Sequence, residues 1–173
     1  MDALAASVRA AVAWLAREGG RYGIDPGRIY LAGHSAGGHL VALLAGADWR
    51  EEGLAADAVK GGLAISGLYD LEPIRLSYLN AALHLDAAAA RRLSPLHRVP
   101  GRAAPLVLAV GGDESAEYHR QQADLAAAWR RAGLAVSEVP LPGRNHFSAL
   151  DALGEPGGPL FRALVARIRG GRA

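Results

Sequence analysis

The sequence contains no cysteine among its 173 residues, and Lys60 is its only lysine. The missing cysteines exclude disulfides and thiolate metal sites, and they give no reason to expect an oxidising compartment. No apolar run approaches the roughly 20 residues that a membrane span needs. Residues 1–17 carry neither a basic segment nor a cleavage-like site, so we expect no signal peptide or membrane anchor. These absences favour a cytoplasmic protein.

Charge of one sign is also scarce, since the net charge is only +2 and the arginines are scattered along the chain. A basic surface for nucleic acid is therefore not expected. Hydrophobic residues make up 51% of the chain and charged residues 21%, which is typical of a globular protein. We expect residues 1–173 to form a single domain.

The pattern of apolar residues predicts an α/β fold with a mostly parallel sheet flanked by helices. Apolar residues at helical spacing predict an opening helix from about Asp2 to the glycines at 19 and 20. Two runs, 62–66 and 105–110, are largely apolar, as expected of strands buried on both faces. Further strands are predicted at 28–32 and 135–139, and further helices at 39–45, 118–129 and 161–168. Residues 71–98 are predicted to be an insertion with one short helix, at 86–92, that forms a cap or a pocket wall.

Gly33-His34-Ser35-Ala36-Gly37 matches the pattern G-x-S-x-G between a predicted strand and a predicted helix, which is the context that a nucleophile elbow requires. In such a turn a strained serine lifts its hydroxyl above the sheet, and the small residues two positions away avoid a clash. The backbone amide of Ala36 would stabilise negative charge on a substrate oxygen, a contribution of roughly 3 kcal/mol. A glycine-rich turn with an incidental serine is the plainer interpretation. A nucleotide-binding loop is not favoured, because neither glycine pattern for it is present.

A serine nucleophile needs a histidine base and a carboxylate, and in this fold the chain order is serine, acid, histidine. Asp113 and Glu114 follow the predicted strand 105–110, and His146 lies in a loop after the last predicted strand. Both loops lie where open α/β sheets place their sites. Either carboxylate could instead cap the following helix.

The other five histidines are weaker candidates for the base. His34 and His39 flank Ser35 too closely in sequence and are expected to pack or hydrogen-bond near the elbow. The other three lie in the insertion or on a helix and are expected to be structural or solvated; they are His84, His97 and His119. No cluster of histidines and carboxylates has convincing ligand spacing, so no metal or organic cofactor is expected.

Several segments together resemble the kynurenine formamidase branch of the α/β-hydrolases. The first is the elbow from Gly33 to Leu40, and the others are Gly67 to Ile74, Ser77 to Asn80, Ser94-Pro95, and Glu114 to Gln122. The resemblance extends from residue 25 to residue 147. It implies hydrolysis of N-formylkynurenine, an aryl formamide, or of small esters as in related carboxylesterases.

The resemblance also assigns residues. Ser35 matches the family's nucleophile, His146 matches the base, and Glu114 falls in the register of the catalytic acid, which is usually aspartate. Either Glu114 serves or Asp113 has replaced it, and the register favours Glu114. The expected partner is a small ester or amide substrate, not nucleic acid or a membrane. Asp70, Tyr78 and Asn80 would line the pocket or only brace the insertion.

The sequence departs from the family at its start. Family members place several strands and a His-Gly-Gly-Trp-like oxyanion loop before the helix with which this sequence begins. The resemblance therefore covers the carboxyl-terminal part of the fold, as expected of an amino-terminally truncated domain. Strand 28–32 would then expose an unpaired edge, through which a homo-oligomer could form. The alternative function is a catalytically impaired remnant or an interaction module.

Overall fold

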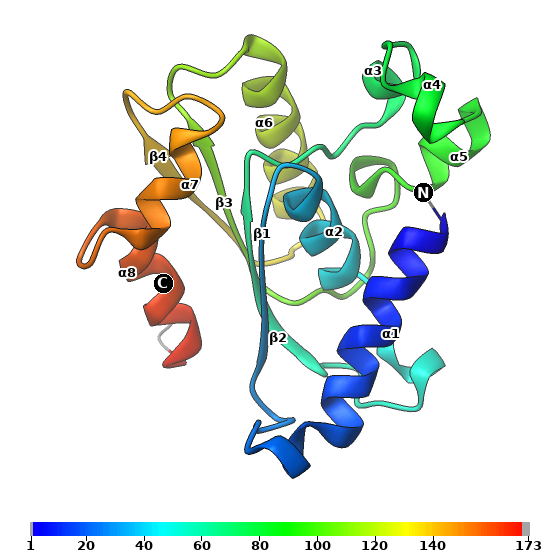
Figure 1. The fold of residues 1–173 in the computed structure, drawn as a ribbon, viewed down its shortest axis with the longest axis vertical. Helices are drawn as coiled ribbons and strands as arrows, with labels where there is room; N and C mark the ends of the chain where they lie inside the picture. The colour runs from blue at the N-terminus through cyan, green and yellow to red at the C-terminus, as the bar shows by residue number, and fades with distance from the viewer. Residues whose placement is uncertain (1, 171–173) are drawn as a thin grey trace.

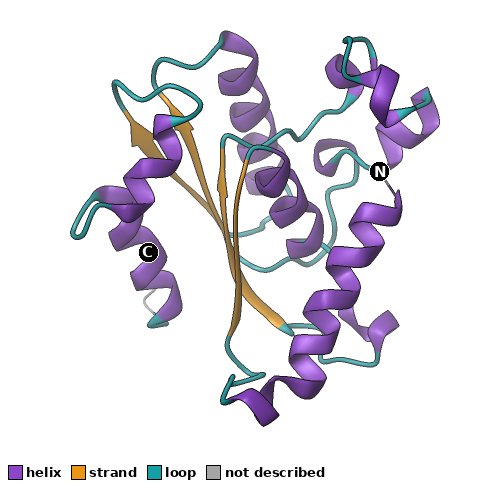
Figure 2. Cartoon of the chain, in the orientation of Figure 1, coloured by secondary structure: helices purple, strands orange, loops and turns teal. Residues whose placement is uncertain are grey.

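The centre of the molecule is a four-stranded parallel sheet in the order β1-β2-β3-β4 (Figure 1). The computed structural model describes residues 2–170. The strands are β1 (Ile29–His34), β2 (Val59–Ile65), β3 (Leu106–Gly111) and β4 (Val136–Leu141). Helices cover both faces of the sheet (Figure 2), which confirms the predicted fold class.

The two predicted apolar strands are the central ones. Every residue of β3 is buried, and so is every residue of β2 except Lys60. A side chain at Gly62 would approach Leu106 and Val41 to 2.7 Å, so this glycine allows the helix after β1 to pack closely on the sheet. β1 extends two residues beyond its predicted end because Gly33 and His34 still pair with β2. The pattern of apolar residues does not show which residues at a strand end pair with the neighbouring strand.

One face of the sheet carries α1 (Asp2–Glu18), α2 (Ala36–Ala45) and α6 (Ala116–Arg131). The strands follow one another in a single direction across the sheet, so right-handed crossovers place their connections on the same face, and α2 and α6 share a core. That core includes Val41 and Ala42 of α2, Leu106 and Leu108 of β3, and Leu125 and Trp129 of α6. α1 packs beside α2 in a second cluster.

The other face is covered by the end of the described chain. Here α7 (Ser148–Asp151) and α8 (Pro159–Ile168) pack on β2 and β3, with Leu160 of α8 fully buried. Four short 3₁₀ turns complete the secondary structure of residues 2–170: Gly19–Tyr22, Trp49–Glu52, Pro95–His97 and Ala152–Gly154. No helix among these residues has both the length and the apolar character required to cross a membrane.

The insertion between β2 and β3 has more helix than predicted. It contains α3 (Glu72–Arg75), α4 (Asn80–Leu83) and α5 (Ala87–Arg92), and only α5 was expected. Helices of four residues are too short to show a period in the sequence. The insertion has its own small core of Leu71, Leu85, Ala90 and Leu93, and it lies beside the amino end of α1 (Figure 1).

Candidate active site

Ser35 lies in a strained turn between β1 and α2. Its φ of +56° and ψ of −118° are outside the regions that a residue with a side chain prefers. Two hydrogen bonds hold this conformation: the Ser35 amide donates to the carbonyl oxygen of Ile65 at 2.9 Å, and the His39 amide donates to the carbonyl oxygen of Ser35 at 3.0 Å. Strain that the surroundings maintain in this way is common at functional sites.

Two glycines near Ser35 are required by close backbone contacts. A Cβ on Gly33 would lie 2.4 Å from the carbonyl group of Gly37, and a Cβ on Gly38 would lie 2.9 Å from the Cα of Gly67. A Cβ on Gly37 would meet nothing within 4 Å. The expectation that Gly33 and Gly37 must both be small is therefore corrected: the crowded positions are 33 and 38, because α2 turns its Gly38 side toward the loop after β2.

We expect Gly38→Ala to lower the free energy of unfolding by about 1–3 kcal/mol, because the added methyl meets backbone atoms that do not move easily. Gly37→Ala is the matched control and should be neutral or stabilising by up to about 1 kcal/mol, since alanine favours helix. Urea unfolding of both variants measures the difference. Equal midpoints for the two variants would contradict the prediction.

His146 joins Ser35 to a carboxylate. Its Nε2 lies 3.1 Å from Oγ of Ser35, and its Nδ1 lies 2.7 Å from Oε2 of Glu114. Because a carboxylate accepts, the Nδ1–H donates to Glu114, which leaves Nε2 free to accept the Ser35 proton. The imidazole side chain is 24% exposed, so a substrate has access to it.

Glu114 is the carboxylate that the structure brings to His146, whereas Asp113 is exposed. The Glu114 side chain is 0% exposed, and its second oxygen accepts hydrogen bonds from the Gly111 amide at 2.7 Å and from the Ser66 hydroxyl. Asp113 contributes through its backbone, since its amide donates to the carbonyl oxygen of Arg144 at 3.0 Å. This amide ties the loop after β3 to the loop after β4.

Ser66 was missed by the sequence analysis. It is buried at the end of β2 with a φ of +49°, and its amide donates to the carbonyl oxygen of Ala109 at 2.7 Å. Its hydroxyl can then reach Glu114. The available signal was its place at the carboxyl end of a buried strand, where open α/β sheets gather polar site residues.

We expect Ser66→Ala to lower the free energy of unfolding by about 1–3 kcal/mol, because a buried carboxylate oxygen loses a donor. Ser115→Ala serves as the control, since the Ser115 side chain caps no amide of α6. Chemical denaturation at neutral pH compares the two variants. An unfolding curve for Ser66→Ala that overlays that of the control would argue against this role.

Three aromatic rings contact the His146 imidazole. The ring centroids of His34 and Tyr118 lie 4.6 and 4.7 Å from it, and that of Phe147 lies at 5.7 Å. Burial and the nearby Glu114 carboxylate raise the pKa of the Tyr118 hydroxyl. Phe147 is 81% exposed and so presents an apolar surface next to His146.

The remaining histidines take other positions. His39 is buried, its Nδ1–H donates to the carbonyl oxygen of Leu68 at 2.8 Å, and burial lowers its pKa. His97 lies 3.3 Å from a carboxylate oxygen of Asp70, and His84 ends α4 in the left-handed region. His119 lies on α6. None of these side chains has a hydrogen bond to Ser35 among the described residues.

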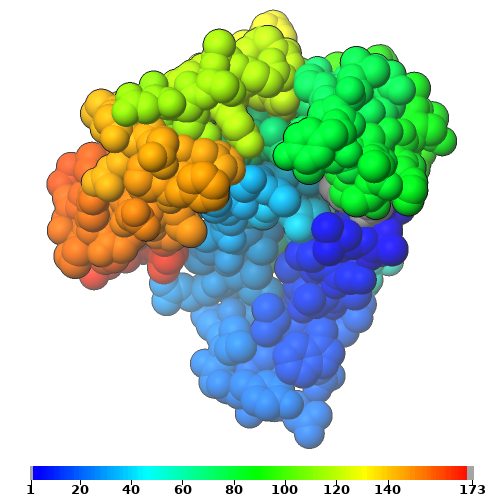
Figure 3. Space-filling model, turned by 45° about the horizontal axis from the view of Figure 1, so that its top comes forward, coloured from blue at the N-terminus to red at the C-terminus, as the bar shows by residue number. Residues whose placement is uncertain are grey.

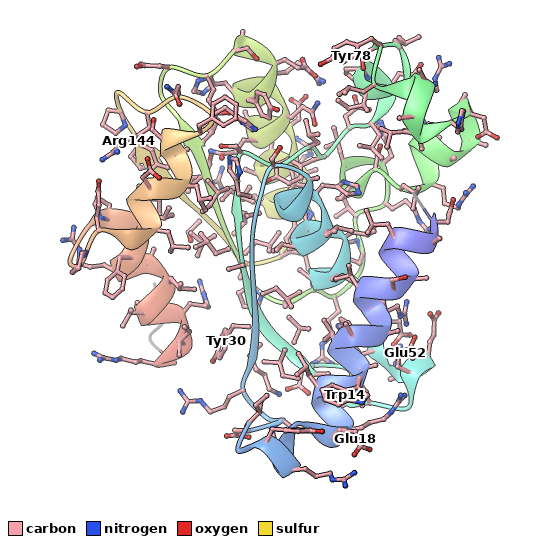
Figure 4. The ribbon with its side chains drawn as sticks, in the orientation of Figure 1. Trp14, Glu18, Tyr30, Glu52, Tyr78 and Arg144 are labelled. Carbon is pink, nitrogen blue, oxygen red and sulfur yellow. The ribbon has the colours of Figure 1, made fainter. Side chains whose placement is uncertain are left out.

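Asp70 and Asn80 both make hydrogen bonds that brace the insertion. Asp70 contacts His97 and caps Glu72, while the Asn80 side chain bonds both the amide and the carbonyl of Leu85. Tyr78 is 87% exposed at the tip of the insertion, on the side of the view opposite Arg144 of the loop after β4 (Figure 4).

Ser35, Glu114 and His146 all lie at the carboxyl ends of the strands. In the space-filling view of this side, the start of α2 lies at the centre, with α6, α7 and the insertion around it (Figure 3). Within residues 2–170, no group of three or more histidines and acidic residues is placed to hold a metal ion.

Comparisons with known proteins agree with this architecture. The family described as BD-FAE matches residues 2–61. Kynurenine formamidase of Danio rerio is 32% identical over 145 residues, covering 81% of this chain and 49% of the fish protein. Kynurenine formamidase of Salmo salar is 34% identical over 131 residues, covering 72% of this chain and 44% of the salmon protein. The chain thus spans about half the length of these curated relatives.

Solved structures give the same result. A proposed thioesterase from Silicibacter sp. TM1040 superimposes with a TM-score of 0.76 at 30% identity, covering 94% of this chain and 59% of that one. A carbohydrate esterase from gut microbiota superimposes with a TM-score of 0.73 over 94% of this chain and 66% of its own, and its 18% identity shows the fold alone. The chain therefore belongs to the α/β-hydrolases, in the branch that contains the kynurenine formamidases and related carboxylesterases.

Proposed function

We propose that this chain carries the reactive centre of a serine hydrolase that cleaves a small ester or an aryl formamide resembling N-formylkynurenine. The observation that carries the proposal is the continuous hydrogen-bonded series from Ser35 through His146 to Glu114. Serine, base and acid in this geometry are the requirements for nucleophilic attack on a carbonyl carbon.

The proposed reaction begins when the Ser35 proton moves to Nε2 of His146 as Oγ attacks the carbonyl carbon. The Glu114 carboxylate stabilises the resulting imidazolium through Nδ1–H. The imidazolium then gives its proton to the departing amine or alcohol, which leaves an acyl group on Ser35. Water, activated by His146, hydrolyses this ester and restores the free serine.

The backbone amide of Ala36 is the proposed donor to the oxyanion. Ala36 is the first residue of α2, and the first amides of a helix have no acceptor within the helix. The positive end of the helix dipole also favours negative charge at this position. One such donor is typically worth about 100- to 1,000-fold in turnover.

The substrate class rests on the relatives and on the aromatic groups near the base. Two relatives are named kynurenine formamidases, whose substrate class the proposal transfers to this chain. Phe147 and Tyr118 offer apolar contacts for an aryl group close to His146. The same centre would accept an activated aryl ester, because both reactions proceed through an acyl-serine.

A fluorophosphonate probe tests the nucleophile, and hydrolysis of N-formylkynurenine beside a p-nitrophenyl ester tests the substrate class. We expect the folded chain to be labelled at Ser35 and to hydrolyse the ester. Preference for the formamide would support the formamidase assignment. A folded sample that takes up no label at Ser35 would count against the whole proposal.

A catalytically impaired chain that acts as an interaction module is the second candidate. The position of β1 favours this candidate. Among residues 2–170, β1 pairs only with β2, and no strand lies along the other edge of β1. Such an edge is a template for pairing with another chain, including a second copy of this one. Light scattering would detect a homo-oligomer, and inactivity toward the probe in an assembled sample would favour this candidate.

A further inference from the structure

The loop that carries His146 contains no regular structure between β4 and α7. Asn145 organises its turn, since the Asn145 side-chain oxygen accepts from the amides of Phe147 and Ser148, both at 3.0 Å. These contacts remain within the loop and its following helix. They do not by themselves set the distance between His146 and Ser35.

Two contacts tie the backbone of this loop to the strand ends. One is the amide of Asp113, which donates to the carbonyl oxygen of Arg144 at 3.0 Å. The other is Nε2 of His34, which lies 2.7 Å from the carbonyl oxygen of His146 itself. The second tie comes from a side chain outside the series Ser35, His146 and Glu114, so a substitution can remove it without altering a reacting group.

His34 is itself held rigidly. It is the last residue of β1, it pairs with Ile65 of β2, and it directly precedes Ser35. Its ring lies 4.6 Å from the His146 ring with a tilt of 43°. One short segment thus carries the nucleophile and contacts both the backbone and the imidazole of the base.

The hydrogen bond to the His146 carbonyl oxygen requires a proton on Nε2 of His34. A carbonyl oxygen only accepts, so Nε2 of His34 must carry the proton, and neutral His34 is the Nε2–H tautomer. Neutral His146 is the opposite tautomer, with its proton on Nδ1 toward Glu114. The two neighbouring imidazoles are therefore distinguishable by spectroscopy.

We propose that His34 is a positioning residue for the general base: its Nε2–H holds the His146 backbone, and its ring limits rotation of the His146 imidazole, so that Nε2 of His146 stays directed at Ser35. This inference rests on the proposed function of Ser35 and His146. Since a displacement of the base affects the reaction step more than substrate binding, loss of the tie should lower kcat and leave KM nearly unchanged.

A matched pair of variants separates the hydrogen bond from the ring. His34→Phe keeps a ring beside His146 but lacks the donor, whereas His34→Gln can place an amide N–H near the position of Nε2. We expect His34→Phe to slow fluorophosphonate labelling of Ser35, and kcat for a p-nitrophenyl ester, about tenfold, the effect of one lost hydrogen bond. His34→Gln should stay within about threefold of the parent.

Imidazole nitrogen NMR of the unmodified chain provides a readout that needs no turnover. We expect His34 as the Nε2–H tautomer and His146 as the Nδ1–H tautomer, and thermal melting checks that both variants are folded. Parent-like rates for His34→Phe, equal losses in both variants, or an Nδ1–H tautomer at His34 would overturn the inference. Failure of the unmodified chain to label would count against the proposed function, while an Nε2–H tautomer at His34 would still support its hydrogen bond to the His146 carbonyl oxygen.

Discussion

Replacing Ser35 with alanine is expected to reduce fluorophosphonate labelling to background and to lower ester hydrolysis by roughly 1,000-fold or more. Alanine lacks the Oγ that lies 3.1 Å from Nε2 of His146, so no atom remains to form the acyl intermediate. Mass spectrometry of the labelled protein and a p-nitrophenyl ester assay measure the two effects.

Ser7→Ala is the matched control for this substitution, because Ser7 is an exposed residue of α1. It should label and turn over at the parent rate. Alanine has the same Cβ as serine and therefore does not relieve the strained φ of +56° at position 35, so melting temperatures should remain similar. Persistent labelling of the Ser35→Ala protein would place the reactive serine elsewhere.

Replacing Glu114 with glutamine is expected to lower kcat by roughly 1,000- to 10,000-fold, as loss of the carboxylate does in comparable triads. Glutamine preserves the shape of this fully buried side chain, but it cannot stabilise the His146 imidazolium with a charge. Its amide group can also donate to Nδ1 and so favour the wrong tautomer. Steady-state kinetics with a p-nitrophenyl ester measures the loss.

Asp113→Asn is the control, since it changes the neighbouring carboxylate, which is exposed and whose amide rather than side chain ties the two loops. We expect less than a threefold change in kcat. If Asp113→Asn proved to be the more damaging substitution, the acid would have to be reassigned to Asp113. The pair therefore tests directly which of two adjacent carboxylates acts.

The elbow could be predicted because its requirements are local. A strand, a serine and a helix that follow one another directly leave few conformations. Position 33 requires glycine because a Cβ there would lie 2.4 Å from the carbonyl group of Gly37. The requirement at Gly38 was not visible, because the atoms it would meet belong to Ile65 and Gly67. Those residues lie at the end of β2 and just after it, distant in sequence, and only the packing of α2 brings them near.

The register of the family resemblance favours Glu114 over Asp113, but it does not show that the Glu114 side chain reaches His146. Adjacent residues point in different directions, and the loop after β3 directs only Glu114 inward, where Gly111 and Ser66 supply donors. The contacts of Ser66 and His34 join segments separated by 48 and 112 residues. No periodicity or motif in the sequence encodes such contacts.

The order of the strands and of the longer helices, the turn at Ser35 and the succession of serine, acid and histidine followed from the sequence alone, because they depend on local conformational preferences and on the apolar pattern of buried strands. Tertiary structure alone decided which carboxylate reaches His146, which glycines are crowded, and which side chains contact the loop that carries His146. Those features depend on angstrom-scale distances between distant segments, and such distances exist only once the parallel sheet brings the ends of its strands together.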